Sequence, residues 1–451
     1  MEFLGVGNMN PYGFRKWVVG VEEKVPLING KRVIGINFDN GATTPPLVSV
    51  MAAVNRFVPW YSSVHRGTGY KSRLSSQIYE DGRKVVCDFV GADPKRDVVI
   101  FTNNTTQAIN KAAKKLGEKG GKEVVLSTAM EHHSNDLPWR DKFHVDYVGI
   151  DGDGRLDMED LERKLKKYEG KVKLVTMTGA SNVSGYINPI HKAARMAHQY
   201  GAKIFIDGAQ LVPHTYVDMK SHRDPEHIDF LAFSAHKLYA PFGIGVLIGP
   251  KEVFLGEPSS DPGGGTVKFV THDEVVWNDP PQNEEGGSPN VIGVIALIQA
   301  IKTLSEIGMH TIEAYERQLT AYTIYRLSQI PDIEIYGDIY NIKDRLGIIS
   351  FNIRGVSHQV TALSLSYEGG IAVRNGCFCA HPYIQKLLKM SKEEVKAYIK
   401  DETRTRPGMV RISLGLYNTF HEIDRLAALL ERIVRNKKYY IDKYEGLDQL
   451  L

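Results

Sequence analysis

The stretch FLAFSAHKLYAPFGIGVLI, residues 230–248, contains two short apolar runs typical of buried strands, with a polar turn between them. Lys237 lies just after the first run. A lysine at such a position is rarely a core residue, because an unpaired buried ammonium group is costly. It either extends to solvent or takes part in chemistry, and a Schiff base with an aldehyde cofactor would use it. Ser234 and His236 beside it could bind a phosphate.

The same kind of apolar run recurs along residues 80–250 and alternates there with helical patterns. This alternation predicts βαβ units and a mostly parallel sheet with helices on both faces. Such sheets bind ligands at the carboxyl ends of their strands. The expected strands are Val98–Phe101, Val124–Ser127, Leu174–Thr178, Lys203–Asp207, Phe230–Ser234 and Gly245–Ile248, and the expected helices include Thr105–Leu116, Met158–Lys167 and His191–Tyr200.

Polar side chains follow three more of these strands. Thr105 and Thr106 begin a helix, where free N–H groups favour a phosphate, although a threonine N-cap is the commoner use of such residues. Asp207 ends a strand and could pair with a protonated pyridine nitrogen or simply cap a helix, and Gln210 is one turn on. His132 could stack on a flat cofactor, since two adjacent histidines make a poor bidentate metal site.

The region from about residue 298 has a different pattern. A helical run over Ile298–Leu327 precedes short strand-like pieces and a further helix near Gln359–Tyr367. We therefore predict a large domain over residues 31–297, and a smaller α+β domain made of residues 1–30 and 298–451. The charged segment Ser391–Arg406 is interpreted as a solvated helix and loop.

Composition excludes several classes of protein. The net charge is +3 and no long basic run occurs, which argues against nucleic acid as the main partner. No run approaches the roughly 18 apolar residues of a membrane-spanning helix, and the first 20 residues lack the pattern of a signal peptide. Three cysteines are too few for a disulfide framework, so we expect a reducing, cytoplasmic setting. Cys87 falls in an apolar helical pattern and is expected in the core.

The other two cysteines lie in RNGCFCAHP, residues 374–382. Cys377, Cys379 and His381 are too close in sequence to supply a closed tetrahedral metal site, so we predict no metal there. A Cys377–Cys379 disulfide would close a tight, strained ring. It remains open as a transient redox or persulfide-relay state, and Cys377 could equally be a packing residue.

Taken together, the chain resembles pyridoxal-phosphate (PLP) enzymes of the class V aminotransferase fold. Within that fold it is similar to the cysteine desulfurase and selenocysteine lyase family of the SUF type, which serves iron–sulfur cluster assembly. The resemblance covers nearly the whole chain, and its motifs are specific in combination. They are NFDNGATTPP (37–46), SSVHRGTGY (62–70), FTNNTTQAIN (101–110), MEHHSNDLPW (130–139), GASNVSGYINPI (179–190), DGAQLVPH (207–214), FSAHKLYAPFGIG (233–245), EGGSPN (285–290), RNGCFCAHP (374–382) and VRISLGLYNTFHEID (410–424).

The resemblance implies PLP-dependent transferase fold type I and a role for each matching residue. Lys237 would hold the cofactor as a Schiff base, Asp207 would pair with its ring nitrogen and His132 would stack on the ring. Asn182 and Gln210 would contact the phenolic oxygen. The phosphate would be bound by Thr105, Thr106, Ser234, His236 and, from the partner subunit of a homodimer with composite sites, Ser288. Arg374 would bind the substrate carboxylate, and Asn182 would also face the substrate.

The resemblance also implies a reaction. Lys237 would move the α-proton of L-cysteine, and the Cys379 thiolate would attack the substrate sulfur, leaving a persulfide on the enzyme and releasing L-alanine. A sulfur-acceptor protein would then take the sulfur. Two departures stand out: Cys377 and Phe378 replace the family's usual histidines, as in molybdenum-cofactor sulfurases, and an unusually long segment separates Cys379 from Arg411.

Other functions stay open at this point. A selenocysteine lyase would use the same residues, because a selenolate leaves without help from an enzyme thiol. An aminotransferase, epimerase or β-lyase of the same fold would leave Cys379 dispensable. A non-enzymatic sulfur-trafficking or regulatory subunit would not need Lys237, Asp207 and Arg374, whose joint presence argues against it. The sequence does not identify the sulfur acceptor or the pathway.

Overall fold

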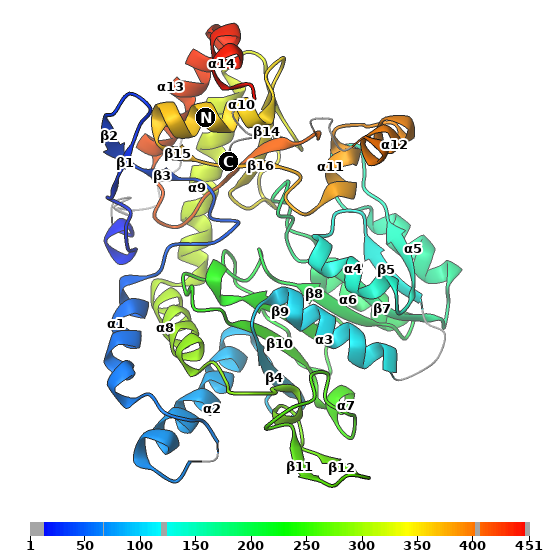
Figure 1. Cartoon of the computed structure of the whole chain (residues 1–451). Helices are drawn as coiled ribbons and strands as arrows, with labels where there is room; N and C mark the ends of the chain where they lie inside the picture. The colour runs from blue at the N-terminus through cyan, green and yellow to red at the C-terminus, as the bar shows by residue number, and fades with distance from the viewer. Residues whose placement is uncertain (1–12, 66, 119–123, 402–405, 447–451) are drawn as a thin grey trace.

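The computed structural model describes residues 13–65, 67–118, 124–401 and 406–446. Two sheets organise this part of the chain, a larger one near the middle of the sequence and a smaller one near its end (Figure 1). Residues 1–12 of the predicted 1–30 segment lie outside the described residues. The predicted domain boundaries stay a prediction.

The larger sheet has seven strands in the order β4-β10-β9-β8-β7-β5-β6. Four neighbouring pairs, from β9 to β6, are parallel, whereas β10 runs antiparallel to both β4 and β9. The prediction of a mostly parallel sheet is therefore confirmed. Its strands are β4 (Asp97–Thr102), β5 (Val124–Thr128), β6 (His144–Val148), β7 (Val172–Thr178), β8 (Lys203–Asp207), β9 (Phe230–Ser234) and β10 (Gly245–Pro250).

Helices cover both faces of this sheet. Successive residues of a strand point to opposite faces, so each strand contributes side chains to both cores. On one face Val98 and Ile100 pack with α3 (Thr105–Glu118), α4 (Leu137–Arg140) and α7 (Lys251–Phe254). On the other face Val99 and Phe101 join a larger core. That core includes residues of α1 (Val48–Phe57), α2 (Tyr70–Val90), α5 (Met158–Lys167), α6 (Ile190–Gln199) and α8 (Val291–Ile307). Cys87 is buried in this core, as expected.

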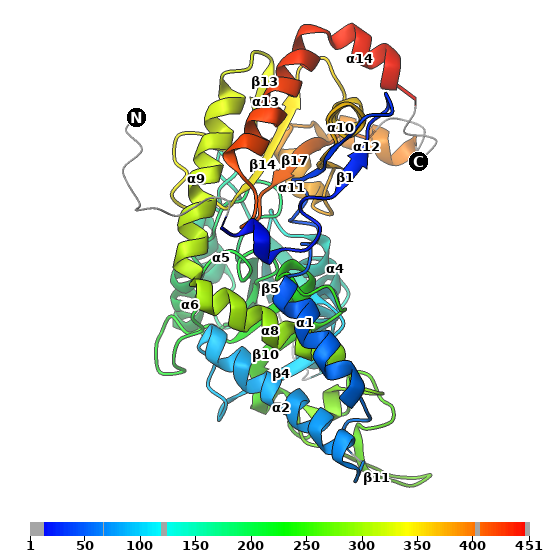
Figure 2. The same cartoon turned by 90° about the vertical axis from the view of Figure 1, so that its left-hand side faces the viewer.

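The smaller sheet is antiparallel and has its own core. Its order is β13-β14-β17-β16, and helices lie beside it (Figure 2). Residues of the sheet and of these helices form a second buried cluster. The strands are β13 (Ile333–Ile335), β14 (Ile348–Ile353), β16 (Arg374–Gly376) and β17 (Met409–Ser413). The helices are α9 (Met309–Ser328), α10 (His358–Gly369), α13 (Phe420–Arg435) and α14 (Lys437–Tyr444). Beside them lie β1 (Lys24–Pro26) paired with β2 (Arg32–Ile34), and β3 (Ile36–Asn37) paired with β15 (Ile371–Ala372).

The single helical run predicted over Ile298–Leu327 is wrong. Two helices, α8 and α9, meet at Gly308, where the backbone has φ +89° and the axis bends by 76°. Glycine takes this conformation at little steric cost. As a result α8 packs against α1 and α2, whereas α9 reaches the second core. Among the described residues no single helix has the length and apolar character to cross a membrane; only this bent pair, taken together, meets that test.

Two short helices come next in the chain, and the first begins within the cysteine motif. The first is α11 (His381–Leu387), and the second is α12 (Lys392–Lys400), which starts with a capping box between Ser391 and Glu394. None of the residues of α12 is buried, so the interpretation of this segment as a solvated helix is confirmed for its helical part. Residues 402–405, part of the predicted loop, lie outside the described residues.

Candidate active site

One pocket lies where the strands of the larger sheet end and the cysteine motif reaches across from the smaller sheet. It collects polar residues that follow β4, β5, β7, β8 and β9. Eleven of the twelve predicted site residues line it: Thr105, Thr106, His132, Asn182, Asp207, Gln210, Ser234, His236, Lys237, Arg374 and Cys379. The remaining lining residues are Gly41, Ala42, Asn104, Ser134, Thr178, Ala209, Asn375, Phe378 and Arg411.

Lys237 ends a short 3-10 helix, Ala235–Lys237, that directly follows β9. Burial lowers the pKa of its ammonium to about 8, and the nearby Asp207 carboxylate opposes this shift. An amine with such a pKa is partly neutral near pH 7 and becomes mostly neutral as pH rises above about 8. It can therefore act as a nucleophile or as a proton carrier.

Asp207 lies at the end of β8 and is almost fully buried. Its Oδ1 accepts a hydrogen bond from the Ala209 N–H at 2.9 Å, but burial still raises the pKa of the carboxyl group. Gln210 nearby donates to the Gly41 carbonyl oxygen at 2.8 Å, while its buried Oε1 has no partner. The site thus holds a carboxylate that needs a cation and an amide oxygen that needs a donor.

His132 follows β5 and lines the pocket, whereas its neighbour His133 contacts His381 outside it, with ring centroids 4.7 Å apart. The Nδ1 of His132 accepts a hydrogen bond from the Ser134 N–H at 3.1 Å, which leaves the proton on Nε2. Burial, followed by the Lys237 charge, lowers the pKa of His132 to about 3. The ring is therefore neutral, which suits stacking on a flat ligand.

The N-terminus of α3 forms one wall of the pocket. The Thr105 hydroxyl lies 2.6 Å from that of Ser234, and the Thr106 hydroxyl lies 2.7 Å from that of Ser134. Hydroxyl groups at a helix N-terminus are well suited to bind a phosphate. His236 is neutral here, because burial lowers the pKa of its imidazole to about 4.

Two arginines face each other across the antiparallel pair of β16 and β17, with Arg374 directly opposite Arg411. Asp39 lies between them: its Oδ1 is 3.1 Å from Nη2 of Arg411 and its Oδ2 is 3.4 Å from Nε of Arg374. Half of the Arg374 side chain is exposed, whereas Arg411 is buried and its Nε has no partner. Sequence reasoning did not assign a role to Arg411, and only its place opposite Arg374 in the sheet reveals it.

The cysteine loop brings an exposed thiol to the pocket. Phe378 and Cys379 both have positive φ, +49° and +54°, so the backbone makes a tight left-handed turn. Two residues that follow strands of the larger sheet hold the loop in place by donating hydrogen bonds to carbonyl oxygens of the loop. The Asn182 amide donates to Phe378 at 2.7 Å, and the His133 N–H donates to Cys379 at 2.7 Å.

Cys377 is held differently from Cys379. Its thiol donates to the Pro407 carbonyl oxygen at 3.1 Å, and burial raises its pKa. It packs against the core of the larger sheet, which agrees with the packing alternative. The twelfth predicted residue, Ser288, lies in a separate hollow with Ser62, His65 and Asn278, and does not line the Lys237 pocket of the same chain.

A partly buried lysine beside a buried aspartate, at the carboxyl ends of a mostly parallel sheet, is the arrangement of the aminotransferase class of enzymes. The family model of class-V aminotransferases matches residues 36–426. The chain belongs to the class-V aminotransferase family and, within it, groups with the cysteine desulfurases.

Curated relatives and solved structures agree on this grouping. The chain is 35% identical to a cysteine desulfurase of Haloferax volcanii over 405 residues, which cover 88% of each chain. It is 36% identical to a cysteine desulfurase of Dickeya dadantii, covering 86% of this chain and 89% of that one. The apo structure of a cysteine desulfurase from Thermococcus onnurineus superposes with a TM-score of 0.78, at 33% identity, covering 89% of this chain and 95% of the other. The predicted fold class, family and enzymatic nature are thereby confirmed.

Proposed function

We propose that this enzyme is a PLP-dependent cysteine desulfurase that moves sulfur from L-cysteine to Cys379 and releases L-alanine. The observation that carries the proposal is the position of Cys379. This exposed thiol lines the same pocket as Lys237, Asp207 and two arginines, although it comes from a different sheet region. An aminotransferase needs the lysine and the aspartate, but it has no use for a thiol held at that place.

The unpaired groups of the pocket fit pyridoxal phosphate. Asp207 offers a buried carboxylate to a pyridinium nitrogen, and the Gln210 amide group lies nearby. The neutral His132 ring would stack on the cofactor, with Asn182 at its phenolic oxygen. Its phosphate would be held by Thr105, Thr106, Ser234 and His236, at the N-terminus of α3 and the end of β9. Bound there, the cofactor supplies an electron sink beside the substrate α-carbon.

The chain's own residues then bind the substrate and move its protons. Arg374 and Arg411 would hold the carboxylate of the amino acid, because guanidinium groups pair with carboxylates in a bidentate way. The Lys237 amine, whose pKa burial lowers to about 8, would take the α-proton on Nζ.

Sulfur transfer requires the Cys379 thiolate to attack the sulfur of the substrate. An S–S bond forms on Cys379 while the carbon–sulfur bond of the substrate breaks, and its electron pair passes to the β-carbon. Protonation of that carbon completes alanine, and the enzyme keeps one sulfur atom as a persulfide. Lys237 and Arg411 both lie within electrostatic reach of this thiol.

A direct experiment tests this proposal. Purified enzyme is mixed with a panel of amino acids while cofactor absorbance is followed, and any persulfide is mapped by mass spectrometry. We expect L-cysteine to give alanine and a persulfide on Cys379. The Cys379→Ala variant should keep its cofactor but lose sulfur transfer, and Cys377→Ala serves as the matched control. Full-rate desulfuration of cysteine by Cys379→Ala would overturn the proposal.

The same variant separates the alternatives. A selenocysteine lyase would still release selenium in Cys379→Ala, because a selenolate leaves without thiol help. An aminotransferase or β-lyase without persulfide chemistry would respond to another amino acid and would not be affected by the substitution.

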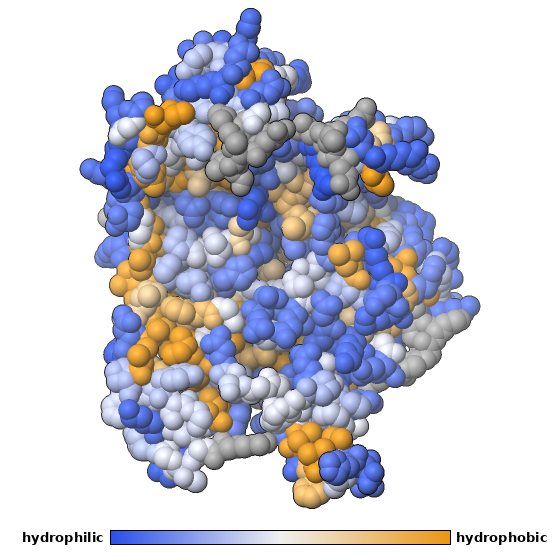
Figure 3. Space-filling view, viewed as in Figure 1, coloured by the Kyte–Doolittle hydropathy of each residue, from blue (hydrophilic) through white to orange (hydrophobic). Residues whose placement is uncertain are grey.

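We further propose a homodimer with composite sites, acting in the cytoplasm on a sulfur-acceptor protein. Figure 3 shows apolar surface over the hairpin β11 (Val267–Val270) and β12 (Val275–Trp277), where Phe269 and Val276 are exposed. Elsewhere an apolar groove is lined by residues of α1, α2 and α8, including Phe57, and by Trp60 of the short 3-10 helix Val58–Trp60. Exposed apolar surface of this kind supports a protein interface.

Hybrid dimers test the contribution of Ser288. One chain carries Lys237→Ala and the other Ser288→Asp, whose negative charge repels the phosphate. If Ser288 acts across the interface, each homodimer is inactive, whereas the hybrid regains one intact site. Lack of recovery in the hybrid would show that Ser288 acts within its own chain, and full activity of Ser288→Asp alone would show that it has no such role.

A further inference from the structure

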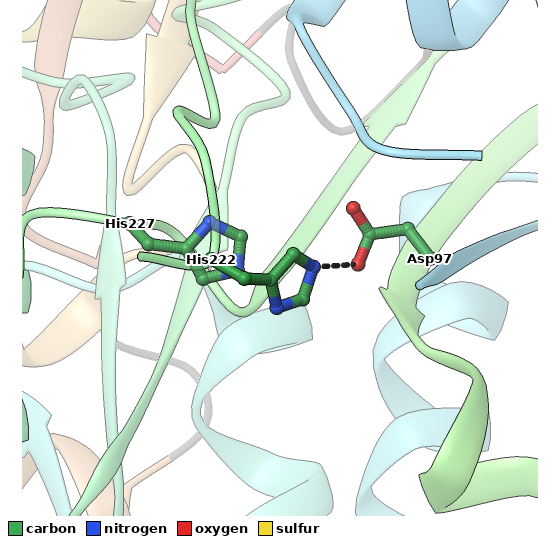
Figure 4. Close-up of side chains that lie close together, drawn as sticks. All are labelled: Asp97, His222 and His227. Atoms are coloured by element: carbon green, nitrogen blue, oxygen red, sulfur yellow. Dashed lines mark hydrogen bonds and ion pairs between the residues drawn. The ribbon is translucent and has the colours of Figure 1, made fainter. Parts of the chain in front are cut away.

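A cluster of three metal-binding residue types lies away from the pocket, and the mechanism uses none of them. Asp97 begins β4, while His222 and His227 belong to the connection between β8 and β9 (Figure 4). One ligand atom from each residue lies within 4.8 Å of the other two. No local sequence pattern indicates this cluster, because the aspartate lies far along the chain from the histidines.

His227 is oriented as a ligand would be. Only 3% of the residue is exposed. Its Nδ1 lies 2.9 Å from both the Met219 and the Lys220 carbonyl oxygens, so this nitrogen carries the proton and donates. The lone pair is therefore on Nε2, which is buried and has no partner. Metal-binding histidines commonly donate their other ring N–H to a backbone carbonyl in this way.

His222 and Asp97 supply the other two ligand atoms of the cluster. The Nε2 of His222 lies 2.9 Å from Oδ1 of Asp97, and the two imidazole rings have their centroids 3.9 Å apart. The other oxygen of Asp97 accepts the Asp93 N–H at 2.9 Å, which fixes the carboxylate. Ligand atoms around a tetrahedral Zn²⁺ lie roughly 3.3 Å apart, given bonds of about 2.0–2.1 Å. Small side-chain movements would therefore admit an ion.

We propose that Asp97, His222 and His227 bind a divalent transition-metal ion of the zinc class, with water as the fourth ligand. Two imidazoles and one carboxylate suit Zn²⁺ and its neighbours in the first row, whereas Ca²⁺ and Mg²⁺ take all-oxygen sites. The ion replaces the hydrogen bond between His222 and Asp97, because Nε2 of His222 and Oδ1 of Asp97 would both become ligands.

The ion has a structural role in this place. It joins the connection between β8 and β9 to the first residue of β4, at the opposite end of that strand from the pocket. His227 precedes Phe230, the first residue of β9, by three positions, and β9 leads to Lys237. The site would thus fix the strand that carries the lysine without contacting the reacting atoms.

Zinc titration of the PLP-loaded enzyme tests the proposal. The Cys379→Ala background removes the exposed thiol as a competing ligand. We expect one Zn²⁺ per chain, and a loss of affinity in His227→Gln and His222→Asn greater than the roughly 10–100-fold that an outer-sphere partner contributes. The matched control is His198→Asn, because His198 pairs with Asp229 at 2.9 Å and with the Pro225 carbonyl at 2.8 Å, so both its nitrogens are occupied.

Equal zinc affinity in His227→Gln and in its parent would overturn the proposal, as would an equal loss of affinity in His198→Asn. A crystal of the unsubstituted enzyme soaked in Zn²⁺ gives an independent measurement that needs no variant. An anomalous scattering peak between Asp97, His222 and His227 supports the site, and peaks found only elsewhere refute it.

Discussion

Gly245 is the position where a single methyl group should do most damage to the cofactor site. It is the first residue of β10, and its backbone passes close to Asn104, just before the N-terminus of α3. A Cβ atom at Gly245 would lie 2.5 Å from the Asn104 carbonyl carbon and 2.6 Å from its Cα. The atoms in the way belong to the backbone, so they cannot rotate aside as a side chain could. The φ angle of Gly245 is not in the left-handed region, so the clash, and not backbone strain, causes the effect.

The size of the effect follows from these distances. Carbon atoms in contact normally lie about 3.5–4.0 Å apart, so Gly245→Ala must push β10 and the start of α3 about 1 Å apart. Overpacking of this kind costs about 1–3 kcal/mol of stability. A shift of about 1 Å in a positioned site can also cost about 100-fold in rate. We expect PLP affinity to fall about 10-fold or more, because Thr105 and Thr106 move with the helix.

Two assays and one control check this prediction. PLP affinity is measured by absorbance after dialysis, and unfolding is followed by heat with and without the cofactor. The control is Gly117→Ala at the other end of α3, where a Cβ would meet only Lys142, at 3.6 Å or more. That substitution should stabilise the helix by about 0.5–1 kcal/mol. Unchanged PLP affinity and unfolding temperature in Gly245→Ala would refute the reasoning.

Three more predictions follow from the site and the helices. Incorporation of PLP into cofactor-free enzyme should accelerate as pH rises through about 8, because the Lys237 amine becomes neutral, and Asp207→Asn should move this inflection to lower pH; a rate that is flat over this range contradicts it. Arg411→Lys should lower kcat/KM about 30-fold, since losing a charge-assisted hydrogen bond costs about 2 kcal/mol, while an unchanged kcat/KM excludes substrate contact. Thr419→Ala should lower the unfolding free energy by about 1 kcal/mol through loss of the α13 capping box, whereas Ser391→Ala should leave global unfolding unchanged because α12 buries nothing.

The larger sheet could be predicted from sequence because its strands are buried on both faces. Runs such as Phe230–Phe233 are apolar throughout, and the polar residue after each run marks the edge where ligands bind. The strand His144–Val148 was missed, since it is an edge strand with mixed exposure and polar residues. The bend at Gly308 was also missed, because the apolar pattern continues across it and only the packing of α8 and α9 on different cores requires the break.

Some residues of the candidate site could likewise be placed from the sequence, whereas others could not. Residues that follow strands of the parallel sheet could be placed together by topology alone, as for Asp207 and Lys237. Arg411 could not, because its position depends on the register of β16 and β17, which no local motif specifies. The tether from Asn182 to the cysteine loop likewise depends on how the loop folds back onto the larger sheet.

The pairing of Arg374 with Arg411 across one rung of the small sheet leaves the pocket short of negative charge. Asp39 is the anion that ion-pairs with both guanidinium groups, and the second anion would arrive with the amino acid. A thiol amine without a carboxylate, such as cysteamine, would leave that positive charge unbalanced. If the two arginines bind the substrate as proposed, the enzyme would select an amino acid by the carboxylate that balances their remaining charge, before sulfur transfer begins.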